Sequence, residues 1–163
     1  VCSASRASFL TGRIPSQHGV HDFIAGGANF GPDAKAFLDD EACYTDVLSK
    51  RGWTCGLSGK WHLGNSALAQ HGFSHWFAHP NGAGAYNDHI MIRNGVAEVA
   101  PGYVTNAITD DALSFIDAHA ADDSPFYLSV HYTAPHSPWS GRGNKLFYSP
   151  AYPYIKSDRQ KRW

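Results

Sequence analysis

A cysteine near the N-terminus lies in a context that suits a reactive group. Residues 2–13 read Cys-Ser-Ala-Ser-Arg-Ala-Ser-Phe-Leu-Thr-Gly-Arg. Serines favour helix starts and glycines favour helix ends, so this segment predicts a short helix over residues 3–12, with Cys2 at its N-terminus and Arg6 one turn further on. Free backbone N–H groups, the helix dipole and the guanidinium favour negative charge there, which suits a thiolate or an anionic substrate. A small buried cysteine beside a capping serine explains the same spacing.

A lysine and a histidine stand two residues apart after a short apolar run. Residues 52–64 read Gly-Trp-Thr-Cys-Gly-Leu-Ser-Gly-Lys-Trp-His-Leu-Gly, and residues 53–57 predict a buried strand. In an extended stretch Lys60 and His62 point the same way, and an ammonium beside an imidazole suits an oxyanion. The alternative is a solvated lysine and a core histidine that flank a packed Trp61. The Gly-Lys pair is not a P-loop, because the upstream glycine spacing and the following Ser or Thr are absent.

A third segment places a histidine between two prolines after another predicted strand. Residues 131–139 read His-Tyr-Thr-Ala-Pro-His-Ser-Pro-Trp, and they follow an alternating apolar run at residues 125–132. Prolines restrict the backbone on both sides and would aim His136. Taken alone, a histidine in a surface loop explains this segment as well.

Together the three segments resemble the type I, formylglycine-dependent sulfatase family. Cys-x-Ala-Ser-Arg-x-x-x-Leu-Thr-Gly-Arg resembles the first signature of that family. The segment that begins Gly-Trp-Thr at residue 52 and ends Gly-Lys-Trp-His-Leu-Gly at residue 64 resembles the second. Ala-Pro-His-Ser-Pro resembles its later sulfate-binding histidine segment. Ala4 stands where the family more often has proline, and Trp53 stands where tyrosine is usual. The resemblance extends from Cys2 to about Trp139 in order and approximate spacing.

The resemblance implies a role for each matching residue. Cys2 would be oxidised to formylglycine by a maturation enzyme, and its gem-diol would attack the sulfur of a small-molecule or carbohydrate sulfate ester. The second hydroxyl would then expel sulfate and restore the aldehyde, which a plain Ser or Cys ester cannot do. Arg6 would hold the diol, and Lys60 would bridge the diol and the sulfate. His62 would position the diol or help remove its proton, and His136 would bind the sulfate and protonate the leaving oxygen.

The resemblance also implies a Ca²⁺ or Mg²⁺ cofactor, with Cys2 among its ligands and hard oxygen atoms as the others. In the family, two aspartates precede the cysteine and an Asp-Asn or similar pair lies far downstream. Residues 1–163 contain neither, so we expect an internal fragment of the catalytic domain that lacks the N-terminal strand with the metal aspartates and the C-terminal part. We expect this fragment to be inactive on its own.

Other polar clusters fail the family pattern. Three aspartate pairs are explained better by solvated helix faces and helix edges than by metal binding: Asp39-Asp40, Asp110-Asp111 and Asp122-Asp123. His18, His21 and Asp22 lie in the loop after the first helix and could line the substrate entrance. His71, His75 and His79 are spaced four residues apart, but we interpret them as a histidine-rich loop because a zinc site needs a clearer ligand set.

The remaining elements must position these segments. Residues 41–50 predict a helix with Ala42, Val47 and Leu48 inward, and residues 103–119 predict the clearest helix. Residues 65–102 predict loops with one short hairpin around residues 89–98. Alternating helices and strands predict an α/β fold of the alkaline-phosphatase type, with a mostly parallel sheet flanked by helices and incomplete in this fragment. In such sheets, ligands bind beyond the carboxyl ends of the strands, where two of the motifs lie.

Composition excludes several classes of function. The 163 residues include 13 basic and 14 acidic side chains, and the net charge of -1 gives no reason to expect a nucleic-acid or membrane partner. Hydrophobic residues make up 43%, which is typical of a single globular domain. Three cysteines do not form a disulfide framework. No targeting signal fixes the location, and a periplasmic or secreted full-length protein is our hypothesis.

Three alternatives stay open. The first is hydrolysis of phosphate or phosphonate esters by an enzyme of the same superfamily. The second is a Cys-His hydrolase that uses Cys2 as a thiolate. The third is a truncated fragment that folds without activity.

Overall fold

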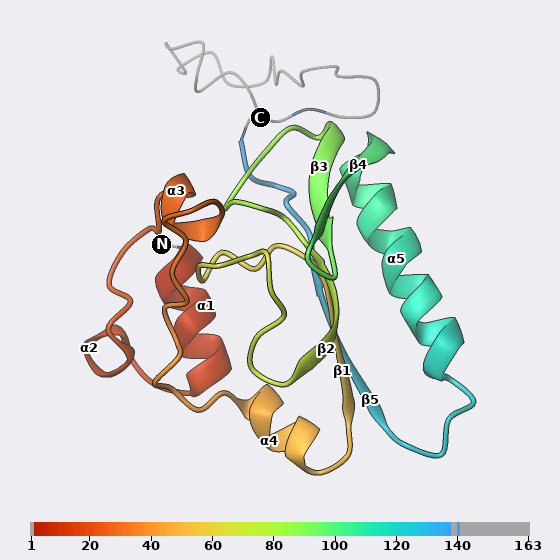
Figure 1. Ribbon diagram of the computed structural model, residues 1–163, viewed down its shortest axis with the longest axis horizontal. Helices are drawn as coiled ribbons and strands as arrows, with labels where there is room; N and C mark the ends of the chain where they lie inside the picture. Colours follow the sequence, from red (N-terminus) through yellow and green to blue (C-terminus); the bar gives the residue numbers. More distant parts are fainter. Residues whose placement is uncertain (1, 138–139, 141–163) are drawn as a thin grey trace, which may run out of the picture.

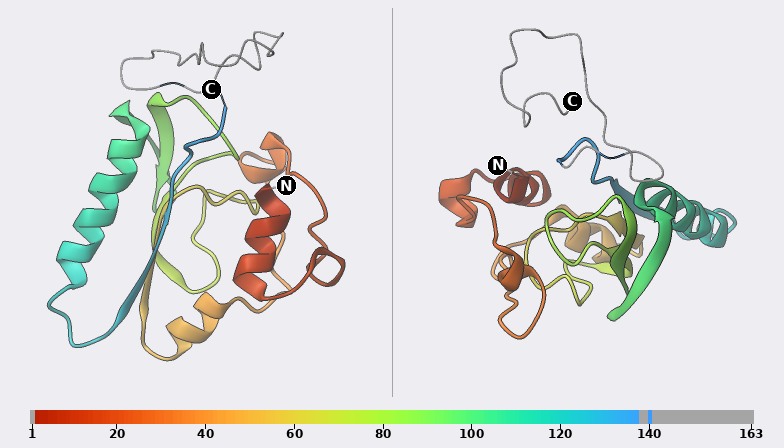
Figure 2. Two further views of the ribbon diagram at one scale, coloured as in Figure 1. Left: turned by 180° about the vertical axis from the view of Figure 1, so that it is seen from behind. Right: turned by 90° about the horizontal axis from the view of Figure 1, so that it is seen from above.

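The computed structural model describes residues 2–137 and residue 140. A five-stranded sheet lies between two groups of helices, with α1 to α4 on one side and α5 on the other (Figure 1, Figure 2). The helices are α1 (Cys2–Thr11), α2 (Pro15–His18), α3 (Gly26–Asn29), α4 (Tyr44–Lys50) and α5 (Val104–His119). The strands are β1 (Thr54–Gly59), β2 (Phe73–Ala78), β3 (Asn87–Arg93), β4 (Val96–Tyr103) and β5 (Phe126–His131).

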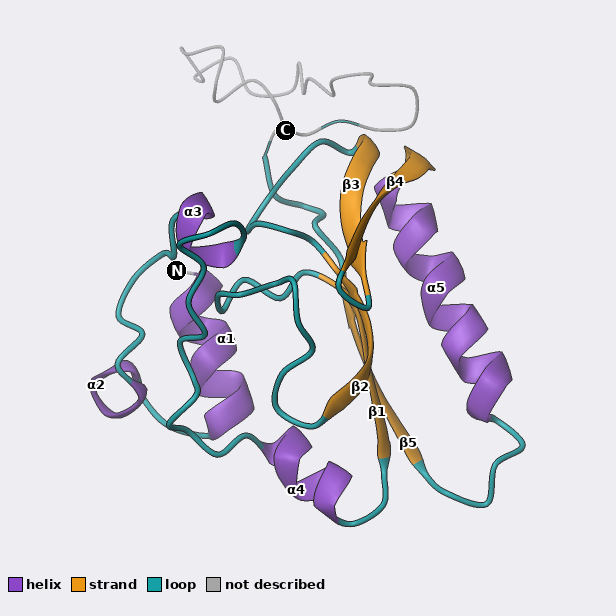
Figure 3. Cartoon of the chain, viewed as in Figure 1, coloured by secondary structure: helices purple, strands orange, loops and turns teal. Residues whose placement is uncertain are grey.

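The strand order is β4-β3-β2-β1-β5 (Figure 3). β1 pairs in parallel with both β2 and β5, whereas β2–β3 and β3–β4 are antiparallel. The predicted α/β fold is confirmed, and the sheet is mixed because the β3–β4 hairpin extends its parallel part. Gly59 at the end of β1 is paired with Ala78 on one side and His131 on the other. The carboxyl ends of three parallel strands therefore meet at one edge of the sheet.

Both faces of the sheet are covered by apolar side chains. On the α1 and α4 side, a buried cluster includes Leu10, Trp61 and Trp76. A second buried cluster, which includes Met91 and Ile108, packs α5 against the hairpin. Each such side chain removed from water contributes about 1.5–3 kcal/mol to the hydrophobic term of folding.

The helix predictions are confirmed in position and corrected in detail. α1 ends at Gly12, whose φ of 68° lies in the left-handed region that favours glycine. α4 begins later than predicted, because an Asp46 oxygen accepts a hydrogen bond from the Cys43 N–H at 2.9 Å and caps the helix there. Ala42 and Val47 are exposed, so their predicted inward position is wrong. Among the described residues, no helix is long and apolar enough to span a membrane.

Residues 65–102 are more regular than predicted. The expected hairpin is present as β3 and β4, but β2 was not predicted. The interpretation of a histidine-rich loop is therefore wrong for His75, which lies within β2, whereas His71 precedes this strand and His79 directly follows it. Polar residues at the start of this strand hide the alternation that predicts a strand.

Asp111 is buried, contrary to the prediction that it lies on the solvated face of its helix. It accepts hydrogen bonds from Ser58 of β1, from His75 at 3.0 Å and from Arg93 at 2.5 Å. Burial raises the pKa of this carboxyl, but these hydrogen bonds outweigh burial and hold it below its usual value. The network ties α5 to three strands of the sheet.

Replacing Asp111 by asparagine is expected to destabilise the fold by roughly 2 kcal/mol at pH 7, because the guanidinium of Arg93 loses its anionic partner. Arg93 is 39% exposed, so the loss stays below that of a fully buried pair. The difference in unfolding free energy between Asp111→Asn and the wild type should shrink as the pH falls below about 4, where the carboxyl of the unfolded protein is protonated.

Urea unfolding at pH 7 and at a pH below about 4 tests this expectation. Asp110→Asn, at the exposed neighbouring position, is the control. An equal loss in both variants would contradict the assignment.

Candidate active site

The polar motifs meet where the carboxyl ends of the parallel strands face the N-terminal end of α1. Lys60 and His62 follow β1, and His136 follows β5 after a short loop. The Lys60 N–H donates to the carbonyl oxygen of His131 at 2.8 Å, which ties the start of the loop after β1 to β5. Gly59, with a φ of 113°, is required at this junction because a Cβ there would overlap the His131 backbone.

Cys2 and His62 are in direct contact. The Cys2 Sγ lies 3.2 Å from the His62 Nδ1, and the His62 Nε2 lies 3.0 Å from the carbonyl oxygen of Ile24. A carbonyl oxygen only accepts, so Nε2 carries the proton and Nδ1 offers its lone pair to Cys2. Burial, with the positive charges of Lys60 and Arg6, lowers the pKa of His62 to about 4 and keeps the ring neutral. His62 is therefore a hydrogen-bond acceptor aimed at the Cys2 side chain.

The orientation of His62 is fixed by the backbone around it. His62 adopts a φ of 59°, which is uncommon for a residue with a side chain and turns the chain sharply after Trp61. Gly82 lies against the imidazole, and a Cβ at this position would overlap the ring. Phe23 packs edge-on against the ring with centroids 5.4 Å apart. These contacts hold the ring in one direction.

Two cationic side chains adjoin the cysteine. Lys60 is 5% exposed, and burial lowers the pKa of its ammonium, while the charge of Cys2 and a hydrogen bond to it oppose that effect. Arg6 is one turn beyond Cys2 on α1 and donates from Nη1 to the Lys60 carbonyl oxygen at 2.7 Å. Burial lowers the pKa of Arg6 to about 10, so it stays charged at neutral pH. The site thus concentrates positive charge at the helix N-terminus.

His136 completes the group at the outer rim. It is exposed, and its Nδ1 lies 2.6 Å from the Ser137 carbonyl oxygen, so Nδ1 donates and Nε2 is left for a substrate. The hydroxyl of Tyr86 donates to its backbone carbonyl oxygen at 2.7 Å. A pocket of about 480 Å³ is lined by Cys2, Ser5, Arg6, Lys60, Tyr132, Thr133, Pro135 and His136.

The structure therefore brings all five predicted site residues together. Four line one pocket, and His62 contacts Cys2 beside it. Pro138 and Trp139, at the end of the third motif, lie outside the described residues.

Two histidines near the site were not assigned a role from the sequence. His79 is fully buried and packs against the tilted ring of His89 with centroids 4.5 Å apart. Its Nε2 forms a hydrogen bond with the Thr133 hydroxyl at 2.7 Å. Burial, then the neighbouring histidine and cations, lowers the pKa of His79 to about 3. His131 contacts Arg6, with the Arg6 Nη1 3.0 Å from its Nδ1. Both histidines lie at the carboxyl ends of parallel strands, and this position in the sequence could have indicated that they lie near the site.

The loop after α1 contributes less than expected. His18 is buried, and its ring bonds to the Ser8 hydroxyl at 3.0 Å and to the Val20 N–H at 3.1 Å, so it holds the loop instead of lining an entrance. Asp22 is exposed and accepts a hydrogen bond from the following N–H. His21 lines an adjacent pocket that shares Ser5 with the pocket at Cys2.

The described residues do not fit a calcium ion by themselves. Calcium takes six to eight oxygen ligands, whereas the pocket around Cys2 is lined by cations, an imidazole and hydroxyl groups but no carboxylate. Asp39, Asp40, Asp122 and Asp123 are exposed, and Asp111 is occupied within the sheet network. Carboxylates for such an ion would have to come from outside this set of residues.

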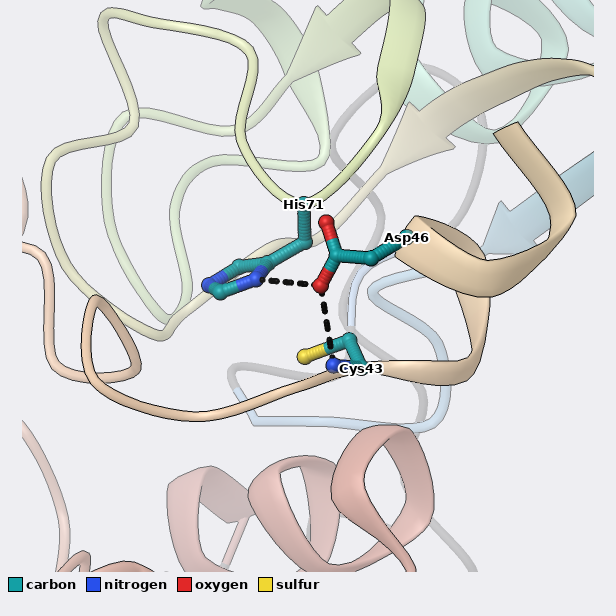
Figure 4. A group of neighbouring side chains, drawn as sticks. All are labelled: Cys43, Asp46 and His71. Atoms are coloured by element: carbon teal, nitrogen blue, oxygen red, sulfur yellow. Dashed lines mark hydrogen bonds and ion pairs between the residues drawn. The ribbon is translucent and has the colours of Figure 1, made fainter. Parts of the chain in front are cut away.

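Among the residues that the structure describes, one group of three side chains has atoms close enough to share a metal ion (Figure 4). Cys43, Asp46 and His71 form this group at the start of α4. The Asp46 oxygen already accepts hydrogen bonds from the Cys43 N–H at 2.9 Å and from His71 at 3.1 Å. The group is explained as a helix cap.

The family model of the sulfatases matches residues 1–161. The chain belongs to the sulfatase family. It is 31% identical to N-acetylgalactosamine-6-sulfatase of Mus musculus, over 85% of this chain and 31% of that protein. It is also 31% identical to N-acetylglucosamine-6-O-sulfatase of Bacteroides thetaiotaomicron, over 83% of this chain and 22% of that protein. This sulfatase chain thus spans 22–31% of the length of these relatives.

Solved structures match the fold of this sulfatase chain. A protein determined in complex with its substrate, D-glucosamine-2-N,6-O-disulfate, has a TM-score of 0.67 and 28% identity over 93% of this chain and 30% of that one. Another, Ps i-CgsB, has a TM-score of 0.75 and 25% identity over 98% of this chain and 40% of that one. The alkaline-phosphatase-like architecture expected from the sequence is therefore confirmed.

Proposed function

We propose that the full-length protein is a sulfuric ester hydrolase whose nucleophile derives from Cys2. The observation that carries this is the meeting of a half-buried Cys2 with the acceptor nitrogen of a neutral His62 and two cations, Lys60 and Arg6. Cleavage of a sulfate ester builds negative charge on the transferring group, and fixed positive charges offset it in place of water. Membership of the sulfatase family supports the same reaction.

We further propose that Cys2 acts as formylglycine, made by a maturation enzyme. Formylglycine supplies a nucleophile that is regenerated after each turnover, which an ordinary serine or cysteine ester does not allow. The surroundings fit such an oxygen-rich group, because His62 can accept its proton while Lys60 and Arg6 stabilise negative charge. His136 is placed to meet the substrate through Nε2 and to give a proton to the leaving oxygen.

The proposal includes a divalent cation with Cys2 among its ligands and with carboxylate ligands from outside the described residues. Calcium or magnesium would add positive charge beside Cys2. Arg6, Lys60 and the histidines would still bind and orient the sulfate from their own side of the pocket.

We propose a carbohydrate sulfate ester as the substrate. One relative is named N-acetylglucosamine-6-O-sulfatase, and one similar structure contains D-glucosamine-2-N,6-O-disulfate. The pocket at Cys2 is open at its rim, where His136 and Tyr132 are exposed, so a large sugar could lie outside while its sulfate enters.

The contact between Cys2 and His62 also favours a second candidate, a thiolate hydrolase. The two differ in the state of Cys2, because a thiol is alkylated by iodoacetamide whereas an aldehyde resists it and reacts with hydrazides.

The test is to produce the full-length protein with a maturation enzyme and assay it on matched aryl sulfate and aryl phosphonate esters, then on 6-O-sulfated amino sugars. We expect the higher kcat/KM on the sulfate, with activity that survives iodoacetamide. A preference for the phosphonate would assign the site to phosphorus esters, and loss of activity on alkylation would favour the thiolate.

A further inference from the structure

A histidine outside the pocket holds a guanidinium that lines it. The Arg6 Nη1 lies 3.0 Å from the His131 Nδ1 and 2.7 Å from the Lys60 carbonyl oxygen. The His131 Nδ1 also lies 3.1 Å from that carbonyl oxygen, a contact that would need the proton on Nδ1. A guanidinium only donates, and the carbonyl oxygen already accepts from Arg6, so the tautomer that satisfies Arg6 has Nδ1 as acceptor and the ring proton on Nε2. The Nη1 group carries two hydrogens, and one goes to each acceptor. Arg6 is therefore held by one backbone atom and one imidazole.

We propose that His131 is a positioning residue for sulfate ester cleavage, which fixes the direction of the Arg6 guanidinium by accepting one of its hydrogen bonds. This inference rests on the function proposed above. It assigns His131 no contact with substrate and no proton transfer.

The two pockets beside Arg6 place His131 behind it. Arg6 and Cys2 line the pocket of about 480 Å³, whereas Arg6 and His131 line a neighbouring pocket of about 290 Å³ with mainly apolar side chains such as Phe9 and Trp61. His131 is not one of the described residues that line the pocket at Cys2. His131 adjoins the pocket through its hydrogen bond with Arg6 and through its backbone hydrogen bond with Lys60.

The location of His131 is itself well fixed. It is the last residue of β5, paired with Gly59, and its carbonyl oxygen accepts the Lys60 N–H at 2.8 Å. Burial, then the charge of Arg6, lowers the pKa of His131 to about 4, so the lone pair on Nδ1 is kept at neutral pH. A buried guanidinium with a rigid planar fork needs fixed acceptors to keep one orientation. A neutral histidine meets this need without adding a negative charge that would compete for Arg6.

The experiment compares two substitutions of equal shape in the full-length, matured enzyme. His131→Asn keeps an acceptor, because the amide oxygen occupies the position of Nδ1, whereas His131→Leu has the same outline without one. We expect His131→Leu to lower kcat for an aryl sulfate about tenfold to a hundredfold, the range for a lost hydrogen bond to a charged group. His131→Asn should stay within about threefold of the wild type.

The activity of the wild type and of the two variants separates the role of His131 from the proposed function. A wild-type enzyme with no activity on sulfate esters contradicts the proposed function, which is separate from the role of His131. With an active wild type, a folded His131→Leu variant of unchanged kcat overturns the positioning role. A folded His131→Asn variant as impaired as His131→Leu overturns it too, since its acceptor is intact. Should His131→Leu fail to melt cooperatively, His131→Val is the second acceptor-free variant, and His131→Asn must still retain activity.

Discussion

Replacing Cys2 by alanine in the full-length enzyme is expected to lower the turnover of an aryl sulfate by about 10⁵-fold or more, the order of loss when a catalytic nucleophile is removed. The physical reason is that Cys2 is the group on which the acceptor nitrogen of His62, the ammonium of Lys60 and the N-terminus of α1 converge. In the proposed mechanism, the remaining side chains would still bind the sulfate group but would have no atom that can attack sulfur. Steady-state kinetics measure this loss directly.

Cys2→Ser separates the nucleophile from its regeneration. A serine hydroxyl could attack once, but its sulfate ester could not be released by elimination, so we expect at most one sulfate group transferred per enzyme. Cys43→Ser is the matched control, because that thiol is buried at the start of α4, away from the pocket at Cys2. Sustained turnover by Cys2→Ser, or more than about 1% activity in Cys2→Ala, would be incompatible with the proposed nucleophile.

Replacing Lys60 by methionine should lower kcat at least about a hundredfold, comparable to the loss of one oxyanion donor. Methionine keeps much of the length of the side chain and removes its charge, so the change tests electrostatics more than packing. Lys60 is 5% exposed and lies beside Cys2, where little water screens its charge. Because negative charge grows as the ester bond breaks, the loss should fall mainly on kcat instead of KM.

Lys50→Met provides the control for Lys60→Met. Lys50 is exposed at the end of α4, and its loss should leave both kinetic constants unchanged. A Lys60→Met enzyme that keeps its melting temperature and has a kcat within about threefold of the wild type would show that Lys60 does not contribute to catalysis.

The convergence of the candidate site residues was predictable because several of them follow neighbouring parallel strands. Lys60 and His62 follow β1 and His136 follows β5, and the carboxyl ends of these strands are neighbours. Cys2 was predictable because glycine and serine signals mark both ends of a short helix. Spacing alone left each of the three segments open to an ordinary structural explanation. The resemblance of all three to one family then indicated that they belong to one site.

The missed features depend on contacts between distant parts of the chain. Asp111 was predicted to lie on the solvated face of its helix, because the helix periodicity contains no information about the strands that pack against α5. Its partners, His75 and Arg93, lie on these strands. His131 bonds to Arg6 across 125 positions of the sequence, so its role depends on the parallel pairing of β1 and β5. No local pattern contains such information.

The state of the residue at position 2 tests the central claim most directly. The full-length protein is produced with a maturation enzyme, and the peptide that contains residue 2 is examined by mass spectrometry alongside an assay of aryl sulfate hydrolysis. We predict the mass loss of a cysteine converted to an aldehyde, with specific activity proportional to the converted fraction. A fully active preparation whose Cys2 is an unmodified thiol would contradict the account.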